Sequence, residues 1–506
     1  MAIQHLSAQI TPMQANQLWL KADKAFEHGD YLSALTGYGQ LYPSDSTNAE
    51  LNYKLGVSNF KLRKYKMNSK KYFDKVNPAD FPEAWFYLGN LNHLLRNNDL
   101  SIENFRSYKN SSSEKEHSIK EIDNLIAKCQ TALLLESQLD NNVQIENLGN
   151  TINTEFAEYA PLIPVMEDFI IFTSRRSNSV YTEKDPMGEY FEDIYMSSKF
   201  GDIWQDPQML NTTINTPLHD ACTGLSADGE RLLIYRTSKD LSGGDIYESA
   251  LALNKFGTPV ILNSNLNSEK YVEASACYSQ DNNTIFFSSN RLGGYGGMDL
   301  YMMKKLSNGK WAMPFNLGPN INTAFNEDAP FVHPSDAVLF FSSEGHTNMG
   351  GYDIFKSNFD ELGNFSDPTN MGYPINTRDD DIFFVLNTDA TTGYFSSERS
   401  GGMGSQDIYK VQFSPNPLPL NVYSAHIIDE NNDPIKKAEI VITDLSAKTI
   451  YGIYKSNEQS GRIVIVSVPN KEYQITIKAI GYEPYTTNII LTSDNDLSYR
   501  LIKHAQ

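Results

Sequence analysis

The first candidate for chemistry in this sequence is a glycine-rich loop that ends in an acid. The stretch reads SSNRLGGYGGMDLYMM from Ser288 to Met303, with four glycines ahead of Asp299. A glycine loop that joins a strand to a helix can hold phosphate with its backbone N–H groups. A metal loop and a plain turn between two strands are the other interpretations, and the stretch alone does not decide among them.

The loop is one of five copies, and the repetition decides its interpretation. The acids of the copies recur at a nearly constant interval: Asp193, Asp245, Asp299, Asp353 and Asp407. Around each acid, short runs alternate apolar and polar residues between Gly, Asn and Ser, which predicts strand, hairpin and strand. The glycine loop is then a turn with no helix behind it, so the phosphate interpretation fails. Four strands in about fifty residues, repeated, are typical of a β-propeller blade.

The repeated acid has a simple structural interpretation. Its carboxylate can accept hydrogen bonds from backbone N–H groups in the turn or from a nearby arginine. The nearby arginines are Arg175, Arg236, Arg291 and Arg399, whereas the fourth copy has Gly345 and His346 at this place. A ring of five calcium sites is the alternative. Calcium takes six to eight oxygen ligands and each copy offers one acid, so the structural interpretation is preferred.

The two ends of the repeat array predict how the ring closes. Four copies end in an asparagine column, formed by Asn215, Asn267, Asn322 and Asn376, but the fifth copy stops before its outer strand. The missing letters occur earlier, where VQIENLGNTINTEFAEYAP from Val143 repeats FNLGPNINTAFNEDAP. We therefore expect Val143 to about Leu148 to form the outer strand of the last blade, which removes an exposed edge. The predicted five-bladed propeller covers residues 143–414. An insertion at 181–189 marks either a binding face or simple loop variation.

Residues 10–140 repeat as helix pairs. A small residue recurs at a nearly constant interval, and an aromatic follows each one at the same offset: Ala22, Gly56 and Gly89, then Tyr38, Tyr72 and Phe105. The small residue lets the second helix pack close, and the aromatic fills the gap between hairpins. The pattern resembles the tetratricopeptide repeat (TPR), which implies an all-α TPR solenoid, and a further helical stretch caps its end.

A basic cluster lies within the helical repeats. Seven cations crowd fifteen positions that hold one acid: Lys61, Arg63, Lys64, Lys66, Lys70, Lys71 and Lys75. One interpretation is a solvated helix face. The other is a docking patch for an acidic partner, because repeat hairpins bind segments along a continuous surface.

A third domain is expected at residues 419–503, after the proline-punctuated SPNPLPL. Strand runs alternate there with turn signals every eight to twelve residues, as in a β-sandwich. The sequence of this part resembles the carboxypeptidase regulatory-like module, which implies an Ig-like β-sandwich without a catalytic zinc. The residues that carry the resemblance are Asp429, Pro434, Ala438, Gly461, Tyr473, Gly481 and Tyr482. The expected fold class is therefore multidomain: an all-α TPR solenoid, a five-bladed β-propeller and an Ig-like β-sandwich.

Composition narrows the function classes. The formal net charge of −20 argues against nucleic acid as a partner. No apolar run approaches the ~18 residues of a membrane helix, and the N-terminus lacks the features of a signal peptide. The three cysteines lie far apart and match no zinc spacing, so they are expected to be buried thiols.

The sequence contains no H-E-x-x-H, G-x-S-x-G, Walker loop, C-x-x-C pair or Rossmann fingerprint. His219, His333 and His346 are ungrouped and are expected to be polar turn or strand residues. We therefore predict that the protein is not an enzyme, and that it has no catalytic residue and binds no cofactor and no metal. An enzyme that assembles carboxylates across blades, as propeller glycosidases do, is the alternative.

The order of helical repeats, propeller with FFSSxR…GGxDIY repeats and regulatory-like sandwich resembles the PorE-like periplasmic proteins of the Bacteroidota type IX secretion system. The resemblance implies a periplasmic, outer-membrane-associated scaffold that binds envelope proteins of the secretion or gliding machinery. A PorP/SprF-like outer-membrane barrel is a plausible partner by the same resemblance. Members of this group usually continue into an OmpA-like domain, so we expect peptidoglycan binding only through a domain that these 506 residues lack. A glycan-binding or glycan-active propeller and an accessory of a surface adhesin are the alternatives.

Overall fold

The computed structural model describes residues 11–111, 115–185, 187–241, 243–252, 255–335, 337–360, 363–414, 420–457, 460–491 and 496–504. The domain boundaries predicted at residues 10 and 419, and most of the predicted linker, lie outside these ranges. The chain forms two compact units, residues 1–133 with 183–190, and residues 134–182 with 191–506. Within the described ranges, no helix is both long enough and apolar enough to cross a membrane.

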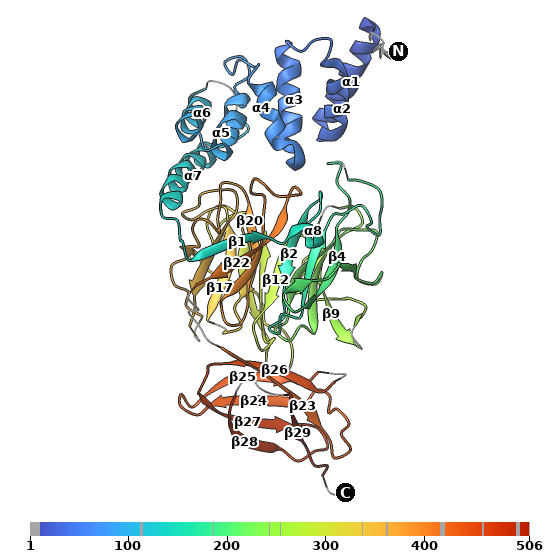
Figure 1. Ribbon diagram of the computed structural model, residues 1–506, viewed down its shortest axis with the longest axis vertical. Helices are drawn as coiled ribbons and strands as arrows, with labels where there is room; N and C mark the ends of the chain where they lie inside the picture. Colours follow the sequence, from blue (N-terminus) through green and yellow to red (C-terminus); the bar gives the residue numbers. More distant parts are fainter. Residues whose placement is uncertain are drawn as a thin grey trace. The chain divides into compact units, whose positions relative to one another are not determined.

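The first unit is built of helix pairs (Figure 1). Its helices begin at side-chain caps such as Thr11, which forms a capping box with Gln14, and Asp30, which accepts from the backbone N–H of Ser33. The elements are α1 (Pro12–Glu27), α2 (Tyr31–Leu41), α3 (Ala49–Lys61), the 3-10 helix η1 (Arg63–Ser69), α4 (Lys70–Phe73), α5 (Glu83–Leu94), α6 (Asn98–Asn110) and α7 (Ile119–Ser137).

Small residues allow close helix packing, with one change from the predicted pairing. A Cβ added at Gly89 would lie 2.5 Å from the Phe105 ring, as the column of small residues predicts. At Gly56 the ring that fills this space is Phe73, 2.8 Å away, and not the predicted Tyr72. The 3-10 helix η1 has three residues per turn, so it shifts the following residues by about one position around the helix. Tyr72 packs edge-on against Tyr42 instead.

The insertion in the first blade has a packing role. Residues 183–190 belong to the same compact unit as the helices. Gly188 lies against Leu32, since a Cβ at Gly188 would approach the Leu32 side chain to 2.4 Å. The backbone of Gly188 has a positive φ of 81°, so this position favours glycine for two reasons.

The second unit contains a five-bladed β-propeller. The propeller consists of five antiparallel sheets, and the first strand of each repeat lies innermost. Each innermost strand contacts the innermost strand of the next blade, and that of the fifth blade contacts that of the first, so the five form a closed ring. Each inner strand carries a bulge near its middle. The inner strands are β2 (Glu158–Leu162), β7 (Asp220–Leu225), β12 (Glu273–Tyr278), β16 (Glu327–Val332) and β20 (Asp381–Leu386).

The remaining strands of each blade follow outward in sequence order. In every blade the third strand begins at one of the repeated acids, except in the second, where it begins one residue earlier. The strands are β3 (Phe169–Ser174), β4 (Asp193–Phe200), β5 (Ile203–Trp204) and β6 (Gln208–Met209); β8 (Arg231–Thr237), β9 (Gly244–Ala252), β10 (Lys255–Phe256) and β11 (Val260–Ile261); β13 (Thr284–Ser289), β14 (Asp299–Lys304) and β15 (Phe315–Asn316); β17 (Val338–Ser343), β18 (Asp353–Asn358) and β19 (Thr369–Asn370); and β21 (Thr392–Ser397) and β22 (Asp407–Phe413).

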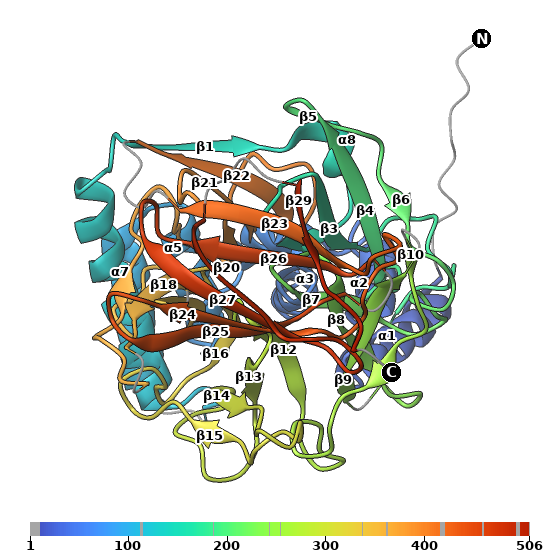
Figure 2. The ribbon, with the colours of Figure 1, turned by 90° about the horizontal axis from the view of Figure 1, so that it is seen from below.

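The ring closes through a strand from the other end of the array. Strand β1 (Val143–Asn147) runs antiparallel to β22, with Val143 opposite Phe413 and Asn147 opposite Tyr409. Both ribbon views show β1 beside β22 (Figures 1 and 2). This is the pairing inferred from the shared NLG and INT letters, and the short helix α8 (Gly149–Ile152) then leads into β2. The fifth blade therefore gains a fourth strand that its own repeat lacks.

The C-terminal part of the second unit is a pair of sheets with a common apolar core. One sheet has the order β26-β23-β29 and the other β25-β24-β27-β28. Side chains from both sheets, among them Tyr423, Ile440, Ile465 and Ile475, are fully buried in one cluster. The strands are β23 (Asn421–Ile428), β24 (Glu439–Asp444), β25 (Thr449–Lys455), β26 (Arg462–Ser467), β27 (Glu472–Lys478), β28 (Tyr485–Ile490) and β29 (Asp496–Arg500).

Candidate functional site

The repeated acids organise the glycine turns. Asp299 accepts hydrogen bonds from the backbone N–H groups of Tyr295 (2.7 Å) and Gly296 (2.9 Å) and from the Asn316 side chain (2.8 Å). Asp353 and Asp407 have the same three kinds of donor, and Asp193 accepts from the backbone N–H of Val180. N–H donors would repel a cation, so the described contacts favour the turn interpretation over a calcium ring.

Two of the repeated acids differ from the others. Burial, reinforced by the charge of Asp220, raises the pKa of Asp193 to about 6. Asp245 is only partly buried, and burial with the charge of Glu269 raises its pKa. Its turn includes residue 242, which lies outside the described ranges.

The arginines near these turns pair with a second ring of acids, which corrects the predicted pairing. Each of these acids begins an inner strand and has no exposed surface. Its arginine lies at or just after the end of the neighbouring second strand of the same blade. The first blade uses Arg176 here, while Arg175 pairs with Glu192. The pairs are Arg176–Glu158 (3.4 Å), Arg236–Asp220 (2.5 Å), Arg291–Glu273 (3.0 Å) and Arg399–Asp381 (2.8 Å).

The fourth blade keeps the acid of this second ring without an arginine. His346 Nε2 lies 2.8 Å from the Ile321 carbonyl oxygen, the equivalent of the carbonyl that an arginine contacts in the other blades. Glu327 is fully buried, and the donors that it receives among the described residues, Thr323 and Ser343, are neutral. Burial raises the pKa of Glu327 to about 7.

Glu327 is therefore expected to make stability depend on pH. Its pKa is higher in the folded chain than the 4.5 of the free side chain, so the folded state holds the proton more tightly. Stability should fall as pH rises from about 4.5 to about 7, by up to about 3 kcal/mol from this group. The Glu327→Gln variant lacks this titrating group, so its stability should not show this fall. As pH rises from about 4.5 to about 7, the urea midpoint of the variant should therefore rise relative to that of the wild type. Parallel pH profiles would contradict the assignment.

The asparagine column clamps the strands that begin at the repeated acids. Asn322 accepts from the backbone N–H of Leu300 (2.7 Å) and donates to the Leu300 carbonyl (3.0 Å). Asn215, Asn267 and Asn376 make the same pair of bonds in their blades. In the fifth blade the clamp is Asn153, which binds Ile408 in this way although 255 positions separate the two. The closing segment thus supplies a complete set of blade contacts.

A polar cluster lies where the inner strands begin. Arg175 donates to Glu192 Oε1 at 2.7 Å, His219 Nδ1 lies 3.0 Å from Glu192 Oε2, and Tyr159 also donates to Glu192. Burial opposes ionisation of Glu192, but Arg175 and His219 outweigh it and hold its pKa well below the usual range. A carboxyl that stays ionised is a poor general acid, and a glycosidase needs one carboxyl with a raised pKa.

The centre of the ring is an apolar cavity between the five inner strands. The cavity is partly open to solvent, and its lining includes Leu162, Leu225, Tyr278, Phe331 and Phe383. His333 lies beside this lining and is bound through its ring nitrogens to Ser335 and the Asn387 carbonyl. His219 lies in the second blade, whereas His333 and His346 both lie in the fourth, and each of the three has its own partners. No potential metal group among the described residues contains them.

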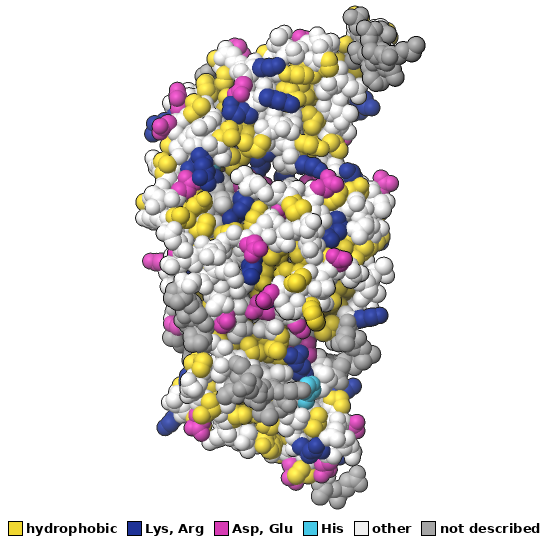
Figure 3. All heavy atoms as spheres, viewed as in Figure 1, with side chains coloured by type: hydrophobic (Ala, Val, Ile, Leu, Met, Phe, Trp, Pro, Cys, Tyr) yellow, Lys and Arg dark blue, Asp and Glu magenta, His cyan; other side chains and the backbone are white. Residues whose placement is uncertain are grey.

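The three cysteines are buried and form no disulfide, as predicted. Burial raises the pKa of Cys222 to about 12, so this thiol stays protonated at neutral pH. Charged side chains of both signs are interspersed on the face drawn in Figure 3.

The basic cluster extends from the end of α3 through η1 to α4. Arg63, Lys64 and Lys71 are exposed, and Lys61, Lys66 and Lys70 are partly buried. Lys70 forms an ion pair with Asp74 (2.6 Å), and the Lys71 ammonium lies over the Tyr72 ring. The cluster is thus on an irregular helical segment, not on the single helix face of one interpretation.

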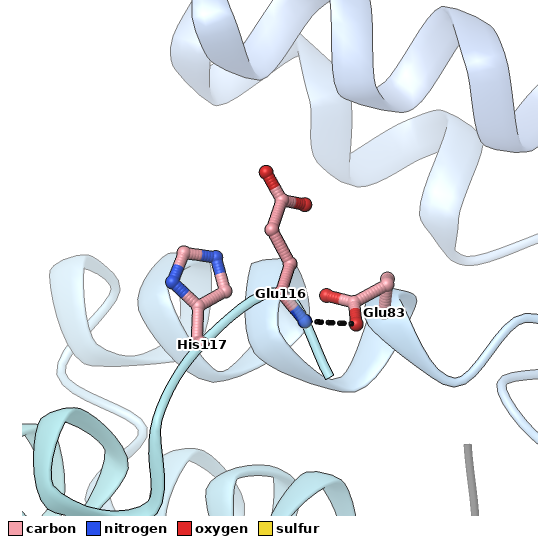
Figure 4. Close-up of side chains that lie close together, drawn as sticks. All are labelled: Glu83, Glu116 and His117. Atoms are coloured by element: carbon pink, nitrogen blue, oxygen red, sulfur yellow. Dashed lines mark hydrogen bonds between the residues drawn. The ribbon is translucent and has the colours of Figure 1, made fainter. Parts of the chain in front are cut away.

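A cluster that the sequence interpretation missed lies in the helical unit. Glu83, Glu116 and His117 each offer one ligand atom, and the three atoms lie within 4.8 Å of one another (Figure 4). Glu83 begins α5, whereas Glu116 and His117 precede α7. No local spacing joins them, so the sequence offered no signal. The second ring of acids did carry one, because Asp220, Glu273, Glu327 and Asp381 recur at the same interval as the acids of the turns.

No protein-family model matches the chain, and no curated protein sequence matches it. Among solved structures it is similar to a protein assigned as TolB from Agrobacterium tumefaciens, with 15% identity over 54% of this chain and 98% of that chain and a TM-score of 0.29. The β-propeller domain of the Trilobed protease from Pyrococcus furiosus has 8% identity over 67% and 84% of the chains and a TM-score of 0.25. CoXyl43, a GH43 β-xylosidase/α-arabinofuranosidase from a compost microbial metagenome, has 14% identity over 53% and 93% and a TM-score of 0.34. Values this low say nothing about chemistry, and the propeller assignment rests on the strand topology of this chain.

Proposed function

We propose that the chain is a non-catalytic scaffold that binds envelope proteins in the periplasm, at the type IX secretion or gliding machinery of a Bacteroidota cell. The helix pairs are taken as TPR-like repeats and the C-terminal sheets as an Ig-like, regulatory-domain sandwich. Both are modules that serve as binding platforms in many proteins. The PorE-like resemblance of the sequence supports the location and makes a PorP/SprF-like barrel the first partner to test. In relatives that carry an OmpA-like domain, that domain would link the scaffold to peptidoglycan.

The observation that carries the non-catalytic part is the use of the repeated polar groups. The acids, arginines and asparagines of the repeat bind turns, strand ends and one another within each blade. Glu192, just before β4, is paired with Arg175. Such groups hold the blades together, and this structural use supports the non-catalytic proposal.

A charge-reversal experiment tests the scaffold role. In Lys64→Glu/Lys71→Glu the net charge of residues 61–75 falls from +6 to +2. Crosslinking to an acidic partner in cells should therefore fall at least tenfold, as measured by quantitative mass spectrometry. Lys21→Glu/Lys24→Glu on α1 is the matched control, because both lysines are exposed and lie outside the cluster. Equal crosslinking by the two variants would exclude the cluster as the docking patch.

The enzyme alternative is tested separately. The purified chain should hydrolyse no glycoside and no peptide. Measurable turnover that one propeller carboxylate substitution abolishes, for example Asp328→Asn, would overturn the non-catalytic proposal in favour of a glycan-active propeller. Asp328 is chosen because it lies in inner strand β16 and accepts from Ser288 (2.6 Å).

A further inference from the structure

We propose that Glu83, Glu116 and His117 form a binding site for one divalent transition-metal ion, with Zn²⁺ as the best-matched ion. All three residues belong to the helical unit, and the ligand atoms they offer lie within 4.8 Å of one another. Imidazole nitrogen together with carboxylate oxygen is a ligand set that suits Zn²⁺, whereas Ca²⁺ and Mg²⁺ prefer oxygen alone.

The histidine is oriented as in a metal site. His117 Nδ1 lies 2.8 Å from Glu121 Oε1, one turn further along the chain. A carboxylate on one ring nitrogen keeps the proton there and leaves the other nitrogen as a lone-pair donor. Figure 4 shows that Nδ1 faces away from the other two residues, so Nε2 is on their side. The ring is held in this position by stacking on Phe86, with 3.6 Å between centroids.

Two buried atoms at the cluster have unused hydrogen-bonding capacity. Among the described residues, neither His117 Nε2 nor Glu83 Oε2 has a hydrogen-bond partner, although both are buried. Buried polar atoms without partners are rare and costly. The other oxygen, Glu83 Oε1, accepts from Tyr108 (2.9 Å) and from the backbone N–H of Glu116 (3.3 Å). These bonds fix the carboxylate so that Oε2 remains available for a ligand.

Charge points to a cation as that ligand. Two carboxylates meet here, and within the described part of the chain no lysine or arginine forms an ion pair with either of them. Ligands of a tetrahedral ion at about 2.1 Å are about 3.4 Å apart, so the present spacing needs a small closure. Glu116 is exposed, and its side chain can rotate to provide it. Three protein ligands leave a fourth position for water.

The test is metal binding by the full, untagged chain, measured by competition with a chromophoric zinc indicator. We expect one Zn²⁺ per chain, and at least tenfold weaker binding in His117→Ala and in Glu116→Gln. Glu116→Gln keeps the result interpretable if loss of the stacked ring impairs folding, since Glu116 is exposed. The matched controls are His28→Ala and Glu103→Gln, which remove an exposed imidazole and an exposed carboxylate of the same unit and should leave affinity unchanged.

A second measurement, the coordination geometry of the bound ion, distinguishes a specific metal site from adventitious binding. With Co²⁺ in place of Zn²⁺, the wild-type chain should show the visible absorption of a four-coordinate ion, and Glu121→Gln, a positioning variant, should shift that spectrum while keeping one ion per chain. Absence of Zn²⁺ binding, or equal affinity in wild type and in both ligand variants, would overturn the site. Neither outcome depends on whether the protein acts as a scaffold.

Discussion

Arg399→Met is expected to destabilise the propeller by about 3–5 kcal/mol at pH 8, because it leaves a buried charge without its partner. Asp381 is fully buried, and Arg399 Nη2 lies 2.8 Å from its carboxylate. Arg399 also donates to the carbonyl oxygens of Pro374 (3.1 Å) and Ile375 (2.6 Å), so the variant loses backbone contacts as well. The measurement is urea unfolding monitored on the propeller transition.

The pH dependence of this loss identifies its cause. Burial already raises the pKa of Asp381, and removal of Arg399 should raise it further. The charge penalty is then present at high pH and should shrink as pH falls and the carboxyl takes up its proton. The double variant Arg399→Met/Asp381→Asn should recover part of the stability at pH 8. A loss below about 1 kcal/mol, or one that is the same at pH 5 and pH 8, would refute the buried-pair explanation.

Glu146→Pro is expected to open the ring and to cost about 2–3 kcal/mol. Leu148 donates to the Ile408 carbonyl and Ser414 donates to the Asn142 carbonyl. Hydrogen-bonded pairs occur at every second residue of an antiparallel ladder. Glu146 and its partner Lys410 lie two positions from the bonded pair of Leu148 and Ile408, so they also form a hydrogen-bonded pair. Proline lacks the N–H, and the Lys410 carbonyl would lose its donor in a strand that joins the two ends of the array.

Hydrogen exchange of the peptide 407–413 measures this opening directly, since β22 is the strand that β1 covers. Protection of its amides should fall by about ten- to a hundredfold in Glu146→Pro, and the exchange of β13 in the third blade should change less. Glu146→Ala is the matched control, because the side chain is exposed and the backbone N–H remains. Unchanged protection of β22 in the proline variant would mean that β1 does not close the ring.

Repetition made the propeller readable from the sequence. Every copy of a repeat forms the same local contacts, so the same residue types recur at the same positions. The evenly spaced acids therefore predict the number of blades and the order of their strands without any knowledge of long-range contacts. The same logic located the closing strand, because the letters around Asn147 and Asn153 match those around Asn316 and Asn322. The two asparagines of the closing segment do bind Asp407 and Ile408, as Asn316 and Asn322 bind Asp299 and Leu300.

Pairings between side chains were less predictable than strand order. Sequence proximity placed the arginines beside the repeated acids, yet Arg236, Arg291 and Arg399 bind the acids that begin the inner strands. Strand pairing brings each of these arginines next to an acid 16 to 18 positions earlier in the chain. The turn acids Asp299, Asp353 and Asp407 accept from backbone N–H groups instead. In the helices a 3-10 segment changed the filling aromatic from Tyr72 to Phe73, a shift that helical periodicity does not encode.

The sequence by itself determined the five β repeats and the strand that closes them, because each depends on local patterns that recur along the chain. It also determined the acidic composition that disfavours a nucleic-acid partner, which needs no structure to establish. Only the tertiary structure decided which acid meets which arginine, that Glu327 is buried without a cation, and that Glu83, Glu116 and His117 meet at one point. Such encounters depend on how separate helices, loops and strands pack. Residues as far apart in the chain as Glu83 and His117 share no local spacing that would predict their contact.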